Sequence, residues 1–257
     1  MNRSTAVIRS DHGRTLTSVK VLLPRLAADL KDSPDFTAPC HNIGAGKDII
    51  IEGKPCTHLF LFIEGAAIRY RILRSGQRVI FNILIPGDFA GLTSCRFAAA
   101  PFSVKTLMPS AVHRIPLSWV SHLCENNPQL AARLFWSSAV ETAMLAEHMI
   151  AVGRRQAPER MAHFLLELLV RLRQRGLADE NMFWFPLTQE IIADALSLSV
   201  PYVNRILQQL RDDDLIEIKN KWIFIRNIEE LSALADFDHD YLQPRAVADI
   251  RASAFSQ

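Results

Sequence analysis

The chain has 257 residues, of which 49% are hydrophobic, and it carries a formal net charge of +2. That length and apolar content favour one large or two small globular domains with a real core. A charge so close to zero neither demands a nucleic-acid partner nor excludes a local basic surface.

No apolar run approaches the roughly 18 residues that a membrane helix needs, and the N-terminus "MNRSTAVIRSDHGR" lacks the apolar core of a signal peptide. We therefore expect a cytoplasmic protein with no membrane partner. The four cysteines, Cys40, Cys56, Cys95 and Cys124, form no CxxC pair. Their spacing predicts reduced thiols rather than a disulfide framework or a zinc site.

Residues 1–34 are a polar tail followed by a short predicted helix that Pro24 interrupts. From residue 35 to about 118 the chain consists of short β-rich runs separated by glycine and proline, such as "HLFLFIEGAAIRYRIL" and "RSGQRVIFNILIPGDF". This pattern of short strands and turns predicts an antiparallel sandwich or roll, and we assign residues 35–126 to it.

Residues 127–153 form a helical pattern that Gly153, and then Pro158, is expected to interrupt. One face of this helix has a 3-4-3-4-3 spacing without a charge; it consists of Ala132, Phe135, Ala139, Thr142, Ala146 and Met149. The stripe either packs on the chain's own roll or forms a two-fold dimer seam. The length of the helix favours the seam, because it would project past a roll of this size.

After this break, "APERMAHFLLELLVRLRQRG" predicts a second amphipathic helix that stops at Gly176. Two shorter helical patterns and two short strands around "KNK" follow it. Helix, helix, helix, hairpin is the order of a winged helix-turn-helix, which we assign to residues 154–230. Residues 231–257 are left as a C-terminal helical tail.

The segment "LTQEIIADALSLSVPYVNRIL" has the packing register of a helix-turn-helix. Ala193, Val203 and Ile206 take the packing positions, and Ser197 stands at the turn, where glycine is commonest. Ser199 is a suitable N-cap, so the second helix should begin near Val200. An ordinary helical hairpin with a surface arginine is the alternative.

These residues resemble the Crp/Fnr family of transcription regulators. The resemblance covers about residues 35–230 and rests on "LFIEGAAIRY", "IPGDFAGL", the long helix opening on "NP", and "LTQEIIADALSLSVPYVNRILQQLRDDDLIEI". It is closest to the branch with "LTQ" and "VNR" in its helix-turn-helix. The expected fold class is α+β: an N-terminal antiparallel β-roll like a cyclic nucleotide-binding domain, a long dimerisation helix, and a C-terminal winged helix-turn-helix.

The resemblance implies that the protein binds double-stranded DNA as a homodimer, with RNA polymerase as a further candidate partner. The implied DNA-binding residues are Thr188, Gln189, Ser199, Val200, Pro201, Tyr202, Asn204, Arg205, Lys219 and Lys221. Asn204 and Arg205 occupy base-reading positions. Pro201 replaces the glutamate with which many members contact cytosine, so the usual half-site is not expected. Residues 154–226 hold 11 Lys/Arg and 10 Asp/Glu, so binding must depend on where the charges lie.

The family's effector pocket maps onto Gly87, Asp88, Phe89, Gly91, Leu92, Cys95 and Leu145. Members that bind cyclic AMP have polar groups where this chain has Leu92, Ala100-Pro101 and Leu145-Ala146, so we expect no cyclic AMP binding. No cofactor is expected. Iron–sulfur members of the family cluster cysteines near the N-terminus, where this chain has only Cys40, so no cluster is expected.

Haem remains an alternative, with His41, His58, His113, His122 or His148 as candidate ligands. Cys95 is either a redox-active thiol or a buried structural one. An apolar or unknown ligand, or none, also stays open.

Two other classes of protein are weighed against a regulator. The chain has no GxSxG, HExxH or phosphate-loop motif, so an enzyme is not expected. The remaining rival is a ligand-binding or protein-interaction module whose helix-turn-helix no longer binds DNA, as Pro201 and Ser197 could indicate. We favour the sequence-specific regulator.

Overall fold

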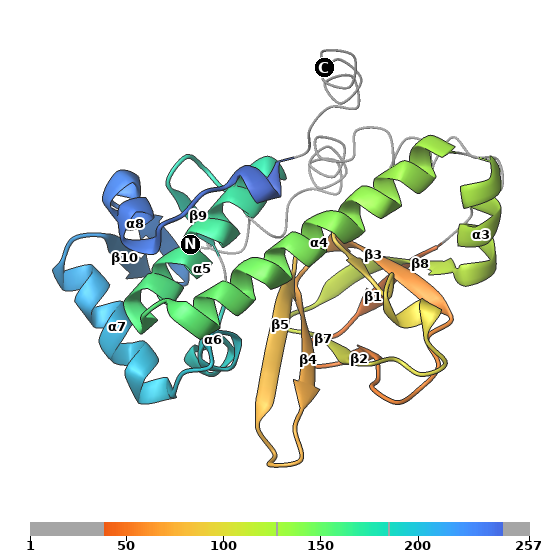
Figure 1. The fold of residues 1–257 in the computed structure, drawn as a ribbon, viewed down its shortest axis with the longest axis horizontal. Coiled ribbons are helices and arrows are strands. Elements are labelled where there is room, and N and C mark those ends of the chain that lie inside the picture. Colours follow the sequence, from red (N-terminus) through yellow and green to blue (C-terminus); the bar gives the residue numbers. More distant parts are fainter. Residues whose placement is uncertain (1–38, 127, 185, 244–257) are drawn as a thin grey trace, which may run out of the picture.

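The computed structural model describes residues 39–126, 128–184 and 186–243. Within these ranges, two antiparallel sheets form one part of the molecule, a winged helix-turn-helix forms the other, and one long helix runs along both (Figure 1). The α+β fold and its order along the chain are confirmed. The helix predicted around Pro24 lies outside the described residues.

The β-roll consists of two four-stranded sheets, with strand orders β1-β8-β3-β6 and β2-β7-β4-β5. The strands are β1 (Cys40–Ile43), β2 (Asp48–Ile50), β3 (His58–Glu64), β4 (Ala67–Ile72), β5 (Arg78–Leu84), β6 (Phe89–Ala90), β7 (Ser103–Thr106) and β8 (Ser110–Pro116). A short helical turn, η1 (Ser94–Arg96), follows β6. Both sheets contribute to one buried cluster, which includes Phe62, Ala67, Leu84, Val104 and Val112. Burial of these apolar side chains between the sheets holds the roll together.

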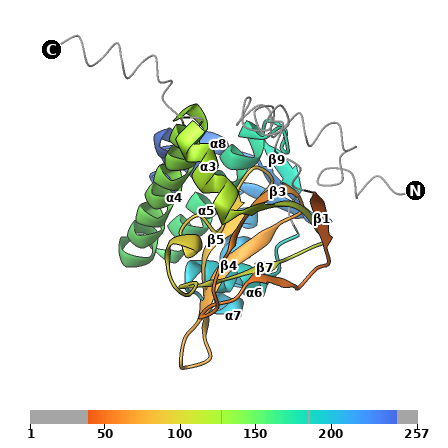
Figure 2. The same ribbon diagram turned by 90° about the vertical axis from the view of Figure 1, so that its right-hand side faces the viewer.

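Two helices follow the roll, α3 (Leu117–Asn126) and α4 (Pro128–Arg154). Figure 2 shows them together on one side of the sheets. The 27 residues of α4 span about 40 Å at 1.5 Å per residue. The expectation that Gly153 interrupts this helix is wrong, since α4 continues to Arg154. A glycine inside a helix costs only about 1 kcal/mol relative to alanine, which the packing of a long helix outweighs.

The C-terminal part contains α5 (Ala157–Gln174), β9 (Met182–Trp184), α6 (Gln189–Leu196), α7 (Val200–Asp212), β10 (Ile216–Lys219), β11 (Trp222–Ile225), α8 (Ile228–Ala235) and η2 (Asp240–Leu242). Helix α5 starts with a reciprocal capping box between Gln156 and Glu159. Pro158 sits in its first turn, where a missing N–H is harmless. The helix stops just before Gly176, whose φ of +66° suits glycine. The predicted stop is therefore confirmed.

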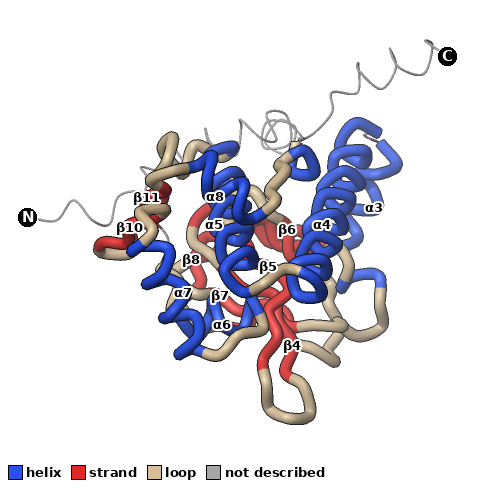
Figure 3. The backbone as a smooth tube through the Cα atoms, turned by 60° about the vertical axis from the view of Figure 1, so that its left-hand side comes forward, coloured by secondary structure: helices blue, strands red, loops and turns tan. Residues whose placement is uncertain are grey.

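The wing has three strands in the order β10-β11-β9, one more than the sequence suggested. Strand β9 pairs antiparallel with β11, with Phe183 opposite Ile223. Phe183 is fully buried in the C-terminal core. This extra strand ties the segment before α6 to the wing, so helix-turn-helix and wing form one unit. Figure 3 shows α6, α7 and the β10–β11 hairpin grouped at one end of the molecule.

The roll and the DNA-binding part share one apolar cluster. It joins Ile80 and Ile83 of β5 to Leu165 and Leu168 of α5 and to Ala195 of α6. Polar contacts reinforce it: Arg78 Nε donates to Asp194 Oδ2 at 2.6 Å, which connects β5 to α6. The two parts are therefore packed against each other rather than joined by a loose linker.

The glycines at the two ends of β4 provide a matched test of this fold. Gly65 and Gly76 have φ angles of +89° and +85°. A Cβ at Gly65 would lie 2.7 Å from the Pro109 carbonyl oxygen, whereas one at Gly76 would meet nothing within 4 Å. We expect Gly76→Ala to lower the free energy of unfolding by about 1–2 kcal/mol through backbone strain alone. Gly65→Ala should cost about 1–3 kcal/mol more because of the clash. Urea unfolding of both variants measures the difference, and equal losses would contradict it.

Candidate DNA interface and sensor cavity

The helix-turn-helix consists of α6, the turn at Ser197, and α7. The Thr188 hydroxyl caps α6, accepting a hydrogen bond from the Ile191 amide at 3.3 Å. Ser197 adopts the left-handed conformation, with φ of 55° and ψ of 45°. This serine thus makes the turn that glycine would make more cheaply, at a cost of about 1–2 kcal/mol.

Helix α7 has two distinct faces. Val203, Ile206, Leu207 and Leu210 are buried in the C-terminal core. The exposed residues are Pro201, Asn204, Arg205, Gln208, Gln209, Arg211 and Asp212, while Val200 and Tyr202 are half-buried. Of the polar side chains expected to be available to DNA on this helix, Asn204 and Arg205 are exposed, whereas Tyr202 packs partly against the core.

Arg205 is held by its neighbour one turn earlier on the helix surface. Its guanidinium carbon lies 4.5 Å from the centre of the Tyr202 ring. Such a stacking contact restricts the guanidinium without using its five donors. Ser199 occupies the N-cap position, but its hydroxyl makes no capping hydrogen bond. That hydroxyl is consequently available for another acceptor or donor.

The wing presents two cations. Lys219 and Lys221 are both exposed, on either side of Asn220. Asn220 and Lys221 both have positive φ, at 52° and 67°, as a two-residue hairpin turn with two left-handed positions requires. The acidic run Asp212 to Asp214 is also exposed, and it follows the C-terminal end of α7 rather than the end that carries Pro201.

A hollow of about 640 Å³ lies between the roll and α4, and it reaches the turn of the helix-turn-helix. It is lined by Arg69, Val79, Phe81, Thr93, Phe102, Ser138, Glu141, Thr142, Leu145, His148, Met149, Val152, Gly153 and Ser197. We call this the sensor cavity. Most of its lining is apolar, so its chemistry suits a ligand with a large apolar part.

Arg69 is the principal charge of the sensor cavity. Its side chain is only 3% exposed and forms an ion pair with Glu141 of α4. Its guanidinium carbon lies 4.9 Å from the centre of the Phe102 ring. Burial lowers the pKa of Arg69 to about 10, which still leaves it charged at neutral pH. Its Nε has no hydrogen-bond partner among the described residues.

Of the seven residues expected in an effector pocket, only Leu145 lines the sensor cavity. Gly87, Asp88 and Phe89 line a separate cavity of about 60 Å³. The carboxylate of Asp88 is already bound there, since Arg171 Nη2 donates to it at 2.7 Å.

Gly91, Leu92 and Cys95 do not line the sensor cavity. Arg69, Val79 and Phe81 of β4 and β5, together with Phe102 just before β7, were missed. Arg69 gave one signal in the sequence, an arginine inside the apolar run "AAIRY".

The uncharged stripe of α4 is not buried against the chain's own roll. All six of its residues, Ala132, Phe135, Ala139, Thr142, Ala146 and Met149, are exposed. The exposed fractions of Phe135 and Met149 are 78% and 76%. Large apolar side chains rarely remain this exposed in a row on a single chain.

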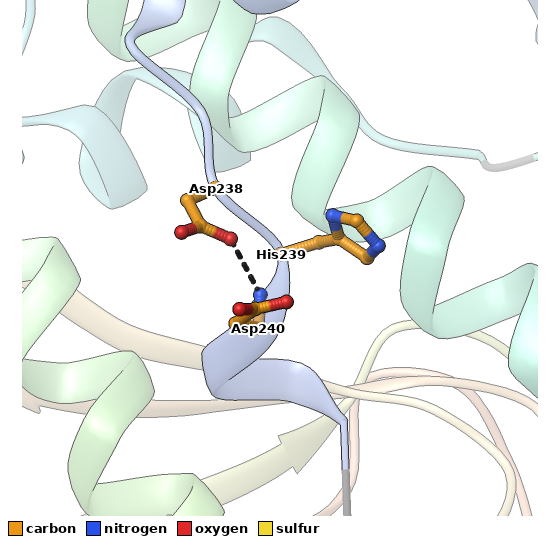
Figure 4. A group of neighbouring side chains, drawn as sticks. All are labelled: Asp238, His239 and Asp240. Carbon is orange, nitrogen blue, oxygen red and sulfur yellow. Dashed lines mark hydrogen bonds between the residues drawn. The ribbon is translucent and has the colours of Figure 1, made fainter.

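One cluster of metal-ligating side chain types is exposed near the C-terminal end of the described chain. Asp238, His239 and Asp240 have potential ligand atoms within 4.8 Å of one another. Figure 4 shows the His239 ring pointing away from both carboxylates. Asp238 instead accepts a hydrogen bond from the Asp240 amide at 2.8 Å, which forms the turn into η2. This arrangement serves the backbone turn.

Among the described residues, none of the helices combines the length and apolar character that crossing a bilayer requires.

Comparisons with known proteins agree with this geometry. Residues 40–127 match the cyclic nucleotide-binding domain family, and residues 159–234 match the Crp-like helix-turn-helix domain family. The chain is similar to the transcriptional activator protein anr of Pseudomonas aeruginosa, with 28% identity over 190 residues, covering 74% of this chain and 78% of that protein. It is also similar to the nitrogen fixation regulation protein FixK of Bradyrhizobium diazoefficiens, with 27% identity over 226 residues, covering 81% and 86%.

Among solved structures, FixK2 from Bradyrhizobium japonicum aligns with a TM-score of 0.71 and 28% identity, over 77% of this chain and 97% of that one. A β-roll of the cyclic nucleotide-binding type that precedes a winged helix-turn-helix defines a DNA-binding transcription regulator. The protein belongs to the Crp/Fnr family of these regulators. Its relatives are transcription regulators and not enzymes.

Proposed function

We propose that the protein binds a two-fold symmetric DNA site as a homodimer and reads bases with Asn204 and Arg205. The exposed face of α7, on which Tyr202 holds the guanidinium of Arg205, is the observation that carries this proposal. Arginine pairs with the O6 and N7 acceptors of guanine, and asparagine pairs with the N6 and N7 of adenine.

Contacts to phosphate must come from a few well-placed groups, because the DNA-binding part has almost no net charge. The N-terminal ends of α6 and α7, with Thr188, Gln189 and Ser199, offer the positive ends of two helix dipoles, and the Ser199 hydroxyl is exposed. Lys219 and Lys221 on the wing add two exposed cations. Such contacts fix the position of the protein on DNA without reading its sequence.

The different roles of Arg205 and Lys221 can be separated by binding titrations. We expect Arg205→Ala to weaken binding to a selected site by about 1–3 kcal/mol and to relax the preference for one guanine in each half-site. Lys221→Ala should weaken binding to all DNA sequences alike. It should also reduce the slope of log affinity against log salt concentration by about one. The titrations use the selected site, each single-base change of it, and unrelated DNA at several salt concentrations. If Arg205→Ala weakens every sequence equally, the assignment of base reading to Arg205 is wrong.

The exposed stripe of α4 is proposed as the dimer seam. Two copies that pair through it would bury the small and apolar side chains of both helices, as in a coiled coil. In this arrangement the two copies of α7 would lie about 34 Å apart, one turn of DNA.

The seam is tested by placing a charge on its largest exposed side chain. Phe135→Asp should raise the dimer dissociation constant at least about tenfold, because dimerisation would bury an unpaired carboxylate. Phe97→Asp is the matched control, since Phe97 is also exposed, at 56%, but follows η1 in the roll. Sedimentation equilibrium measures both constants. A wild-type protein that is monomeric at micromolar concentration with full DNA affinity would rule out the seam.

The sensor cavity is proposed as the effector site. Its apolar lining and the unpartnered Nε of Arg69 fit a mainly apolar molecule that has one hydrogen-bond acceptor. Cyclic AMP does not fit this description. A buried phosphate needs several donors, but the guanidinium of Arg69 is already paired with Glu141.

This preference is measurable with an apolar fluorophore. We expect anilinonaphthalene sulfonate to bind the wild-type protein and not to be displaced by cyclic AMP. Val79→Trp, which fills part of the cavity, should weaken fluorophore binding several-fold, while Phe97→Trp, outside the cavity, should not. Displacement by micromolar cyclic AMP, or equal binding by both variants, would contradict the proposal.

A further inference from the structure

Two cysteine thiols that are distant in the sequence meet inside the β-roll. Cys56 precedes β3, and Cys95 lies in η1, 39 residues later, yet their sulfur atoms are 3.5 Å apart. Each thiol also lies 3.3 Å from the backbone carbonyl oxygen of His58, to which it donates. The two sulfurs are thus in contact and held by a common acceptor.

A glycine keeps the space around this pair open. Gly91 has a φ of +101°, and a Cβ there would lie 2.8 Å from the His58 carbonyl oxygen and 3.5 Å from the Cys56 sulfur. Any other residue would press on the shared acceptor and on one thiol. The backbone at Gly91 therefore leaves room for the pair and for its shared acceptor.

The two thiols differ in their access to solvent. Cys56 is half-buried and lines a hollow of about 180 Å³, together with Lys54, His58 and Arg114. Cys95 is buried in the apolar cluster that contains Leu59, Leu61, Ile115 and Leu134. Burial raises the pKa of the Cys95 thiol to about 12, so this sulfur remains protonated at neutral pH. A small reagent can therefore reach Cys56 first, and Cys95 lies directly behind it.

We propose that Cys56 and Cys95 form a reversible disulfide when hydrogen peroxide enters this hollow. The Cys56 sulfur attacks the peroxide, its O–O bond breaks, and a sulfenic acid and water are formed, with two electrons passing from sulfur to oxygen. The Cys95 sulfur then attacks the Cys56 sulfur. The S–S bond forms as the S–O bond breaks, and the departing hydroxide takes the thiol proton of Cys95 to give a second water. A small thiol that enters through the same hollow reverses the step by thiol–disulfide exchange.

The two cations of the hollow suit this chemistry. Lys54 and Arg114 line it beside Cys56, and the Arg114 guanidinium lies 3.3 Å from the His58 ring. Positive charge in this hollow stabilises the hydroxide that departs from Cys56. The same cations would attract an anionic reducing thiol.

Disulfide formation would change the wall of the sensor cavity. The two sulfurs would move from 3.5 Å to about 2.05 Å, which draws η1 towards the start of β3. Thr93, which lines the sensor cavity, immediately precedes η1. On the proposed function, oxidation would therefore alter DNA affinity through this wall.

The bond itself is tested by peptide mapping of the full-length protein. Wild-type protein is treated with equimolar hydrogen peroxide, its remaining thiols are alkylated, and it is digested without a reductant. We expect a cross-linked pair of peptides joining Cys56 and Cys95, lighter by two hydrogen atoms than the reduced pair and lost after dithiothreitol. Recovery of both cysteines as alkylated thiols, or oxidation of Cys56 to a sulfinic acid with Cys95 still a thiol, would overturn the proposal.

Variants separate the roles of the two thiols. Cys95→Ala should leave Cys56 as a sulfenic acid that dimedone traps, and Cys56→Ala should slow the oxidation of Cys95, because burial keeps its thiol protonated and poorly nucleophilic. Cys40→Ser, which removes an exposed thiol of the roll, is the matched control and should form the cross-link normally. Oxidation of Cys95 in Cys56→Ala at the wild-type rate would refute the order of attack.

A DNA titration of the oxidised and reduced wild-type protein then tests the regulatory consequence. An affinity change of several-fold that is absent from Cys95→Ala would support it, and equal affinities would refute it. If neither form binds DNA while the cross-link is present, the proposed function fails and the disulfide stands.

Discussion

The guanidinium of Arg171 determines how the two parts of the molecule fit together. It projects from α5 into the roll, where it donates to the Ile83 carbonyl oxygen at 2.8 Å and to the Asp88 carboxylate at 2.7 Å. Only 4% of its side chain is exposed. A buried charge without partners costs several kcal/mol, so α5 cannot leave the roll without exposing Arg171 to water or leaving it unpaired. Arg175, one turn later on α5, binds the other oxygen of Asp88 and strengthens the same attachment.

Because α5 is fixed on the roll, the helix-turn-helix is also close to the sensor cavity. Helix α6 contacts β5 through Arg78 and Asp194, and the turn residue Ser197 lines the cavity itself. The wall of the cavity is thus shared by the roll, by α4 and by the helix-turn-helix. A ligand that changes the separation of these elements would act on the position of α7 directly, because interfaces of this kind repack between discrete arrangements rather than bend.

The fold was largely predictable from the sequence. Short β runs, one long helix and a helix-helix-hairpin unit can each be recognised from the residue pattern of their own segment. The exposed face of α7 followed from helical periodicity alone, with Val203 and Ile206 marking the buried side. Strand β9 was missed because three residues form a strand only when β11 is beside them. The sensor cavity was missed for a similar reason: Arg69, Phe102 and Leu145 come together only in the tertiary fold. Asp88 was assigned to an effector pocket by resemblance, but its two arginine partners on α5 cannot be found by local pattern.

Thr142 and Met149 belong both to the exposed stripe of α4 and to the lining of the sensor cavity. In the proposed dimer, the partner's α4 would therefore form part of the outer wall of the cavity. A ligand that fills the cavity would then contact both copies. Its binding would therefore favour the dimer over the monomer. Linkage requires the converse as well: association of the two chains must raise the affinity for the ligand by the same factor. On this proposal, the sensor cavity would be complete only when two copies meet.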